Sequence, residues 1–181
     1  NVGDEGGFAP LINSNEEALK MIVDAIEKSN LKPGKDIVIC LDIAANELIN
    51  NEGQYSIQSN SYDSVDNVID YYKKLTSNYP IKSIEDPFAE EDWESWKKIT
   101  NEIGKKIQIV GDDLFVTNTK RLKKGIKEKS ANSILVKPNQ IGTLTETLEV
   151  ISTAKQSNFN IIISHRSGDS EDTFIADLAA A

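Results

Sequence analysis

Five short apolar runs in this 181-residue chain each end at polar residues that could take part in chemistry. In chain order these residues are Asp42, Glu85, Asp112, Lys137 and the string Ser164-His165-Arg166-Ser167. Right-handed crossovers bring the carboxyl ends of parallel strands to one face of a fold, and in barrels that face carries the active site. We therefore expect three carboxylates, a lysine, a histidine and an arginine to converge in space.

The three carboxylates suit a hard divalent cation. Carboxylate oxygens together with water are the ligands that octahedral Mg²⁺ prefers, and they suit zinc or copper much less well. Asp42, Glu85 and Asp112 are therefore candidate Mg²⁺ ligands. A single acid at a strand end is often only a helix cap or a solvated loop residue. Three acids in register with a lysine favour a site.

The basic residues of the series suit proton transfer and anion binding. Lys137 follows the apolar run 134–136, so it is expected at the rim of the sheet, where an amine can serve as a general base. The alternative is a structural ion pair with one of the acids. His165 is the only histidine and has polar neighbours, which disfavours a packed core position. Arg166 and Ser167 are typical of an anion clamp, because guanidinium binds phosphate oxygens as a bidentate fork.

The elements that must position these residues alternate between strand and helix. The predicted strands are Ile37–Ile43, Ile81–Glu85, Ile107–Asp112, Ser133–Lys137 and Asn160–Ser164. Each is nearly continuous in apolar residues, which is typical of parallel strands buried on both faces. Helical patterns lie between them, and the residues that close the last four strands recur at nearly equal steps. The pattern predicts an α/β fold, either a doubly wound sheet or a (β/α) barrel.

Two helices are predicted from capping boxes, in which a Ser or Thr precedes a Glu by three residues. Ser14 begins a helix whose apolar face is Ala18, Leu19, Ile22, Val23 and Ile26, and Thr143 begins one with Leu144, Leu148 and Ile151. The other crossovers are predicted at Tyr71–Leu75, Trp93–Ile103 and Arg121–Ile126. The two tryptophans of the second crossover are interpreted as helix-to-sheet packing.

The composition excludes several classes of protein. The formal net charge of −9 argues against a nucleic-acid or anionic-membrane partner. The single cysteine, Cys40, cannot form an internal disulfide, which indicates a reducing, cytoplasmic compartment, and we expect it in the core. No apolar run reaches the roughly 18 residues that span a bilayer. The chain begins at Asn1 in a glycine-rich loop and ends at Ala181 in a helical run, which suggests a piece of a longer protein.

Five motifs, in this order, resemble the enolase family. They are Gly3-Asp-Glu-Gly-Gly7, Ser83-Ile-Glu-Asp-Pro-Phe88 with Glu90 and Trp93, Asp112-Asp113-Leu114, Lys137-Pro-Asn-Gln-Ile-Gly-Thr143, and Ser164-His-Arg-Ser-Gly168 with Glu171-Asp-Thr173. The resemblance covers essentially the whole chain. It implies that residues 1–181 are a partial C-terminal barrel domain, with about five parallel strands and intervening helices. The family's N-terminal cap domain and the last part of the barrel would lie outside the chain.

The resemblance also implies an activity, that of a phosphopyruvate hydratase. This glycolytic lyase interconverts 2-phosphoglycerate and phosphoenolpyruvate by Mg²⁺-assisted proton abstraction and dehydration. Matched to the family's motifs, the ligands of the first Mg²⁺ are Asp42, Glu85 and Asp112, the base is Lys137, the residue that helps to expel the hydroxyl is Glu5, and the substrate and phosphate contacts are His165, Arg166 and Ser167. The full-length protein is expected to be a cytoplasmic homodimer, and the chain alone is expected to be inactive.

Two alternatives remain open from the sequence. One is a racemase or cycloisomerase of the same superfamily, against which the Arg166 and Ser167 pair and the Gly3–Gly7 loop favour enolase. The other is a non-catalytic protein-binding role. Lysine pairs such as Lys97-Lys98 and Lys123-Lys124 are more simply solvated helix faces, so the sequence displays no such binding site.

Overall fold

A computed structural model describes residues 1–3, 6–57 and 63–181 as parallel strands that alternate with helices. The strands are β1 (Ile39–Asp42), β2 (Ile81–Glu85), β3 (Gln108–Gly111), β4 (Ser133–Val136) and β5 (Asn160–Ile163). The helices are α1 (Asn15–Lys28), the 3₁₀ turn η1 (Ala45–Leu48), α2 (Val65–Asn78), α3 (Trp93–Ile103), α4 (Thr119–Glu128), α5 (Pro138–Ile141), α6 (Leu144–Gln156) and α7 (Phe174–Ala180). All five predicted strands are confirmed, each within its expected range.

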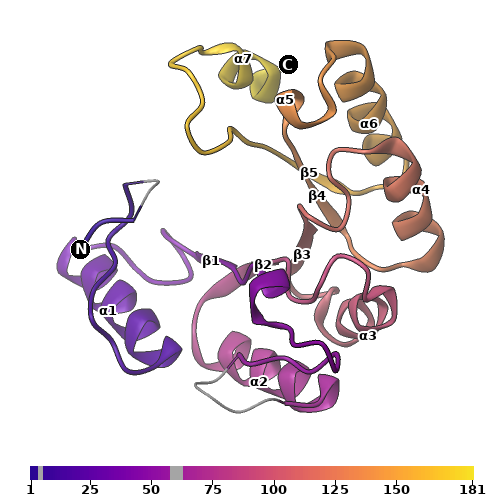
Figure 1. Ribbon diagram of the computed structural model, residues 1–181. Helices are drawn as coiled ribbons and strands as arrows, with labels where there is room; N and C mark the ends of the chain where they lie inside the picture. Colours follow the sequence, from indigo (N-terminus) through magenta and orange to yellow (C-terminus); the bar gives the residue numbers. More distant parts are fainter. Residues whose placement is uncertain (4–5, 58–62) are drawn as a thin grey trace.

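The order of the strands distinguishes between the two predicted topologies. They form one parallel sheet in the order β1-β2-β3-β4-β5, so every crossover leads to the adjacent strand in the same direction. A doubly wound sheet reverses its strand order at a switch point, whereas a (β/α) barrel does not. Figure 1 shows the strands as a curved arc with α2, α3, α4 and α6 along its outer side. The fold is therefore part of a barrel wall.

Burial falls from the centre of the sheet to its edges. Ile84, Ile109 and Ile134 on the three central strands are fully buried, as expected for strands covered on both faces. Cys40 lies on β1, an edge of the five-stranded sheet, and is exposed. The expectation that Cys40 belongs to the core was therefore wrong, because an edge strand has a neighbour on only one side. The packing role expected for the tryptophans of α3 is confirmed by Trp96, which is fully buried.

The two helix starts predicted from capping boxes are correct, whereas α2 begins at Val65, before its predicted range Tyr71–Leu75, and some residues expected on buried helix faces are exposed. The Ser14 hydroxyl accepts the Glu17 amide and the Thr143 hydroxyl accepts the Glu146 amide, each at 3.2 Å, which confirms both caps. On α1, Leu19 and Ile26 are buried as expected, whereas Ile22 is exposed. On α6 the buried residues are Thr147, Val150 and Ala154, while Leu144 and Leu148 remain about half exposed. The buried face of α6 thus carries smaller residues than the predicted one.

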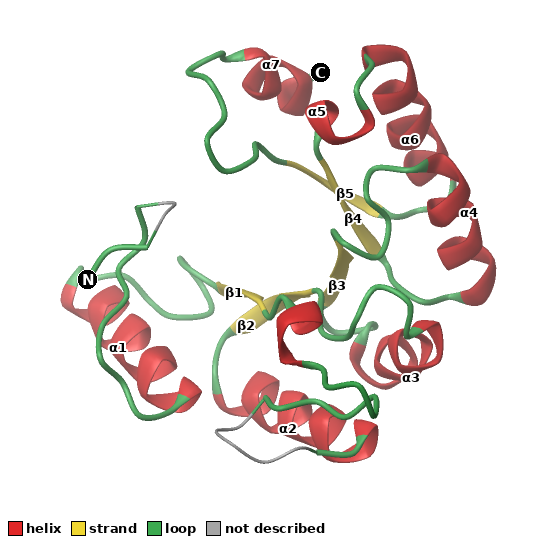
Figure 2. Cartoon of the chain, viewed as in Figure 1, coloured by secondary structure: helices red, strands yellow, loops and turns green. Residues whose placement is uncertain are grey.

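Figure 2 separates the secondary-structure elements from the loops that join them. The loops that follow β1, β2, β3 and β4 all leave the same edge of the sheet, because the four strands are parallel. No helix in the described part of the chain is long and apolar enough to cross a membrane.

Candidate metal and active site

Four of the predicted site residues meet at the carboxyl edge of the sheet. Asp42 and Glu85 are paired neighbours in the register of β1 and β2, so their side chains leave adjacent strands at the same level. Asp112 and Lys137 are the first residues after β3 and β4. The charges of Asp42, Asp112 and Lys137 all act on Glu85, which places the four residues within one electrostatic environment.

The Asp112 carboxylate is the most buried acid of the predicted set. Its Oδ2 forms an ion pair with Lys137 Nζ, and the two side chains are only 10% and 18% exposed. Its Oδ1 is buried and has no hydrogen-bond partner among the residues that the structure describes. An ionised oxygen without a partner in a buried position is costly. A cation bound there would satisfy it, so this donor set fits a divalent metal ion.

The other two acids of the predicted set, Asp42 and Glu85, have raised pKa values. Burial, together with the charges of Asp42 and Asp112, raises the pKa of Glu85 to about 8. Loss of solvent around the carboxylate also raises the pKa of Asp42, although a 3.0 Å hydrogen bond from the Ala44 amide acts against it. Like charges gathered in a poorly solvated place resist ionisation. The same carboxylates become favourable once a dication offsets their charge.

Asp86 ties the loops of β2 and β3 together. It is only 3% exposed, and its φ of 43° lies in the left-handed region, which is uncommon for a residue other than glycine. Its two carboxylate oxygens accept the backbone amides of Asp112 and Asp113, each at 3.0 Å. Burial raises the pKa of Asp86 to about 7, even though these two amides favour its ionised form. Asp86 therefore fixes the backbone that presents the Asp112 carboxylate.

The acids fall into two clusters that share Asp86. Their ligand oxygens lie within 4.8 Å of one another in Asp42, Glu85 and Asp86, and again in Asp86, Asp112 and Asp113. The predicted trio of Asp42, Glu85 and Asp112 is thus divided between the two. Asp86 and Asp113 are not among the site residues predicted from the sequence. The signal available for both was that each directly follows a predicted ligand.

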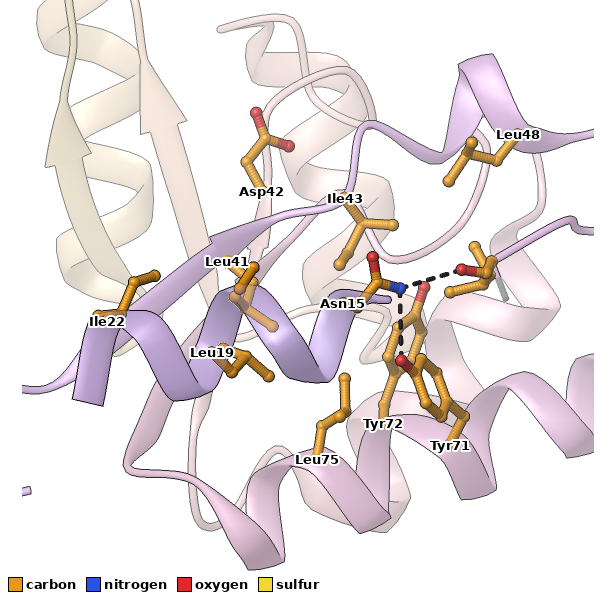
Figure 3. Close-up of a pocket in the computed structure, with 12 residues that line it drawn as sticks. Asn15, Leu19, Ile22, Leu41, Asp42, Ile43, Leu48, Tyr71, Tyr72 and Leu75 are labelled. Carbon is orange, nitrogen blue, oxygen red and sulfur yellow. Dashed lines mark hydrogen bonds between the residues drawn. The ribbon is translucent and has the colours of Figure 1, made fainter. Parts of the chain in front are cut away.

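A cavity of about 300 Å³ opens beside Asp42 but does not belong to the acid clusters. It lies between α1, β1 and α2 and is lined mainly by aliphatic side chains, among them Leu19, Leu41 and Leu75. Figure 3 shows the Asp42 carboxylate directed away from these side chains. The polar group at the far end is Asn15, which donates hydrogen bonds to the Ile57 carbonyl at 3.1 Å and the Tyr71 hydroxyl at 3.3 Å.

The family of the chain follows from comparison with known proteins. The family model that describes the enolase C-terminal TIM barrel domain matches residues 1–181. The chain belongs to the enolase family. The enolase of Pelagibacter ubique (strain HTCC1062) is 60% identical over 179 residues, which cover 99% of this chain and 42% of that protein. This chain thus spans less than half the length of the relative, and it belongs to the enolase C-terminal barrel domain.

The remaining residues expected from the enolase resemblance are less well assembled. His165, Arg166 and Ser167 follow β5 in an exposed loop. The Arg166 amide donates to Asp169 at 3.3 Å, and Asp169 also accepts a 3.0 Å hydrogen bond from the Asn139 side chain. Within the described ranges no hydrogen bond or ion pair joins His165 or Arg166 to the acids of the two clusters. Glu5 lies outside the described residues.

Proposed function

We propose that this chain supplies the metal-binding and proton-abstracting part of a phosphopyruvate hydratase. Such an enzyme interconverts 2-phosphoglycerate and phosphoenolpyruvate, a step of glycolysis. The observation that supports this proposal most strongly is the pairing of Lys137 with Asp112, whose second carboxylate oxygen is buried without a partner. Metal-assisted proton abstraction requires a base and a metal ligand close together. Lys137 can supply the base, and the unpartnered oxygen of Asp112 can bind the metal ion.

Asp42, Glu85 and Asp112 are proposed to hold the metal ion, and Mg²⁺ is the ion that such oxygen ligands suit best. The reaction needs this ion because the proton beside a carboxylate is barely acidic. Its removal adds a further negative charge to an existing anion, and a bound dication stabilises that charge as a Lewis acid. Asp86 contributes by holding the backbone amide of Asp112 in place.

Lys137 is proposed as the base that takes the proton from C2 of 2-phosphoglycerate. In the structure its amine donates to Asp112, which is the arrangement of the structural ion pair that the sequence left as an alternative. The two roles are compatible, because the ion pair with Asp112 orients the Lys137 amine near the proposed metal site. A cation bound to Asp112 would free the amine from this pair, and the amine would accept the C2 proton in its neutral form.

The roles of the other residues complete the proposal. Glu5 would act on the leaving hydroxyl, while His165, Arg166 and Ser167 would bind the substrate and its phosphate. These three residues follow β5 on the same edge of the sheet as the acids, which is consistent with closure around a substrate that spans both. We further propose that the full-length enzyme is a cytoplasmic homodimer.

The test uses a full-length carrier, by which we mean an enolase-length protein that contains these 181 residues, either naturally or in place of the matching segment of the Pelagibacter relative. Conversion of 2-phosphoglycerate to phosphoenolpyruvate is measured in a coupled assay with and without Mg²⁺. We expect Mg²⁺-dependent turnover. Loss of a proton from other carboxylate substrates without action on 2-phosphoglycerate would instead support a racemase or cycloisomerase, and metal binding without any turnover would support a binding role.

A further inference from the structure

Two consecutive residues of the loop after β3 have unusual backbone conformations. Val116 and Thr117 have φ values of 43° and 52°, in the left-handed region. Both are β-branched, and in this region a β-branched side chain crowds its own backbone. Strained residues of this kind persist only where the surrounding structure holds them, and they gather at functional sites. The surrounding structure must therefore stabilise Thr117 in this conformation.

Two hydrogen bonds of the Thr117 side chain provide this stabilisation. Thr117 is fully buried, and its hydroxyl is hydrogen-bonded on both sides. The oxygen accepts the backbone amide of Lys137 at 2.9 Å, and the hydroxyl donates to Oε1 of Gln140 at 2.8 Å. Lys137 lies between the end of β4 at Val136 and the start of α5 at Pro138. The hydroxyl thus takes the place of a strand neighbour for the amide of Lys137.

These contacts form a closed circuit through the site. The side chains of Asp112 and Lys137 are paired, and the amide of Lys137 is bonded to Thr117. The loop returns to its start through the amide of Val116, which donates to the carbonyl of Asp112 at 2.8 Å. The main chain of Lys137 is therefore bound to the same loop that carries Asp112, its ion-pair partner. The position of Lys137 does not depend on the ion pair alone.

We propose that Thr117 is a positioning residue, which holds the main chain of Lys137 so that its amine meets the C2 proton of the substrate. This inference rests on the proposed function, in which Lys137 is the base. It predicts that loss of the hydroxyl impairs proton abstraction and leaves substrate binding largely intact. A residue that merely filled the core would change the stability of the protein without changing the step at which the reaction is limited.

The experiment compares three variants with the unmodified full-length carrier. Thr117→Val keeps the shape and the β-branch but removes the hydroxyl, and Thr117→Ser keeps the hydroxyl. Thr147→Val is the matched control, because Thr147 is equally buried and its hydroxyl donates at 2.8 Å to the carbonyl of Thr143, the N-cap residue of α6, and not to Lys137. For each variant we would measure kcat and KM for 2-phosphoglycerate, the primary isotope effect with substrate deuterated at C2, and the amide hydrogen exchange of Lys137.

We expect Thr117→Val to lower kcat about 10- to 100-fold, because small displacements of a reacting group have effects of this size. KM should change less than about twofold, the isotope effect should rise, and the Lys137 amide should exchange faster. Thr117→Ser should restore kcat to within about threefold of the unmodified carrier, and Thr147→Val should leave kcat unchanged. Should Thr117→Val fail to fold, Gln140→Leu carries the test, since it removes the acceptor of the hydroxyl proton and should lower kcat about threefold or more.

The inference is overturned if Thr117→Val keeps the kcat of the unmodified carrier, if Thr117→Ser is as slow as Thr117→Val, or if the isotope effect does not change. In the fallback case an unchanged kcat of Gln140→Leu overturns it. Failure of the proposed function is a separate result, because it appears in the unmodified carrier as absence of turnover on 2-phosphoglycerate. The role of Thr117 is judged only relative to that unmodified protein.

Discussion

Replacement of Glu85 by glutamine tests the electrostatics of the site without any assumption about the reaction. Burial and the neighbouring acids raise the pKa of Glu85 from 4.5 to about 8 in the folded protein. Between these two values the folded protein holds a proton that the unfolded chain has lost. The contribution of Glu85 to stability is therefore largest at low pH, and it falls as the pH rises toward 8.

The size of the effect follows from the pKa shift. At about 1.4 kcal/mol for each pH unit, a change from 4.5 to about 8 corresponds to about 5 kcal/mol if it is fully realised. Glu85 is only partly buried, so solvent screening reduces this to about 2 kcal/mol. Glutamine has the same shape and does not titrate. Relative to the wild type, Glu85→Gln should therefore gain about 2 kcal/mol of stability between pH 5 and pH 8.

The assay is urea unfolding of the full-length carrier and its variants at several pH values, with a chelator present to exclude metal ions. Glu52→Gln is the control, because Glu52 lies on an exposed turn. The difference in unfolding free energy between this control and the wild type should not depend on pH. If the difference between Glu85→Gln and the wild type is equally independent of pH, then Glu85 is not forced to hold a proton, and our description of the acid clusters is wrong.

Three further predictions concern the metal site and the core. Asp86→Asn should weaken divalent-ion binding by about 1–3 kcal/mol in calorimetry. The NH2 group of asparagine would face one of the two backbone amides whose hydrogen bonds Asp86 now accepts. An unchanged affinity would contradict this prediction. Metal binding at pH 7 should release close to one proton, because Glu85 must ionise, and calorimetry in buffers of different ionisation heat would measure it; release of no proton would count against Glu85 as a ligand. Gly125→Ala should destabilise the protein by about 1–3 kcal/mol in urea unfolding, because the new Cβ would overlap the Phe115 ring. The cost of this overlap exceeds the gain of about 1 kcal/mol in helix propensity. A more stable variant would refute the prediction.

Much of the site could be predicted because it depends on chain order. Once strands and helices alternate, the ends of parallel strands must meet, so the convergence of Asp42, Glu85, Asp112 and Lys137 needed only the strand positions. The strands themselves were recognisable because buried parallel strands are continuously apolar. The alternation of strands and helices alone left open the choice between a barrel and a doubly wound sheet, whereas the enolase motifs implied the barrel that the strand order confirms.

What the sequence could not provide depends on backbone conformation and on packing between distant segments. The role of Asp86 requires a φ of 43° and two amides from a loop more than twenty residues away. The role of Thr117 likewise requires its left-handed conformation and its contact with Lys137. On α6 the apolar spacing suggested that Leu148 would be buried, but Val150 and Ala154 are buried instead. No local pattern carries this information.

Exchange of the C2 proton of 2-phosphoglycerate with deuterated solvent tests the central claim most directly. The measurement compares the full-length carrier with its Lys137→Ala variant in the presence of Mg²⁺, followed by NMR, with Lys35→Ala as a control at an exposed position. Our account predicts that the unmodified carrier and Lys35→Ala exchange the proton, and that Lys137→Ala does not. Exchange at an unchanged rate in Lys137→Ala would show that another group removes the proton, and it would contradict the account.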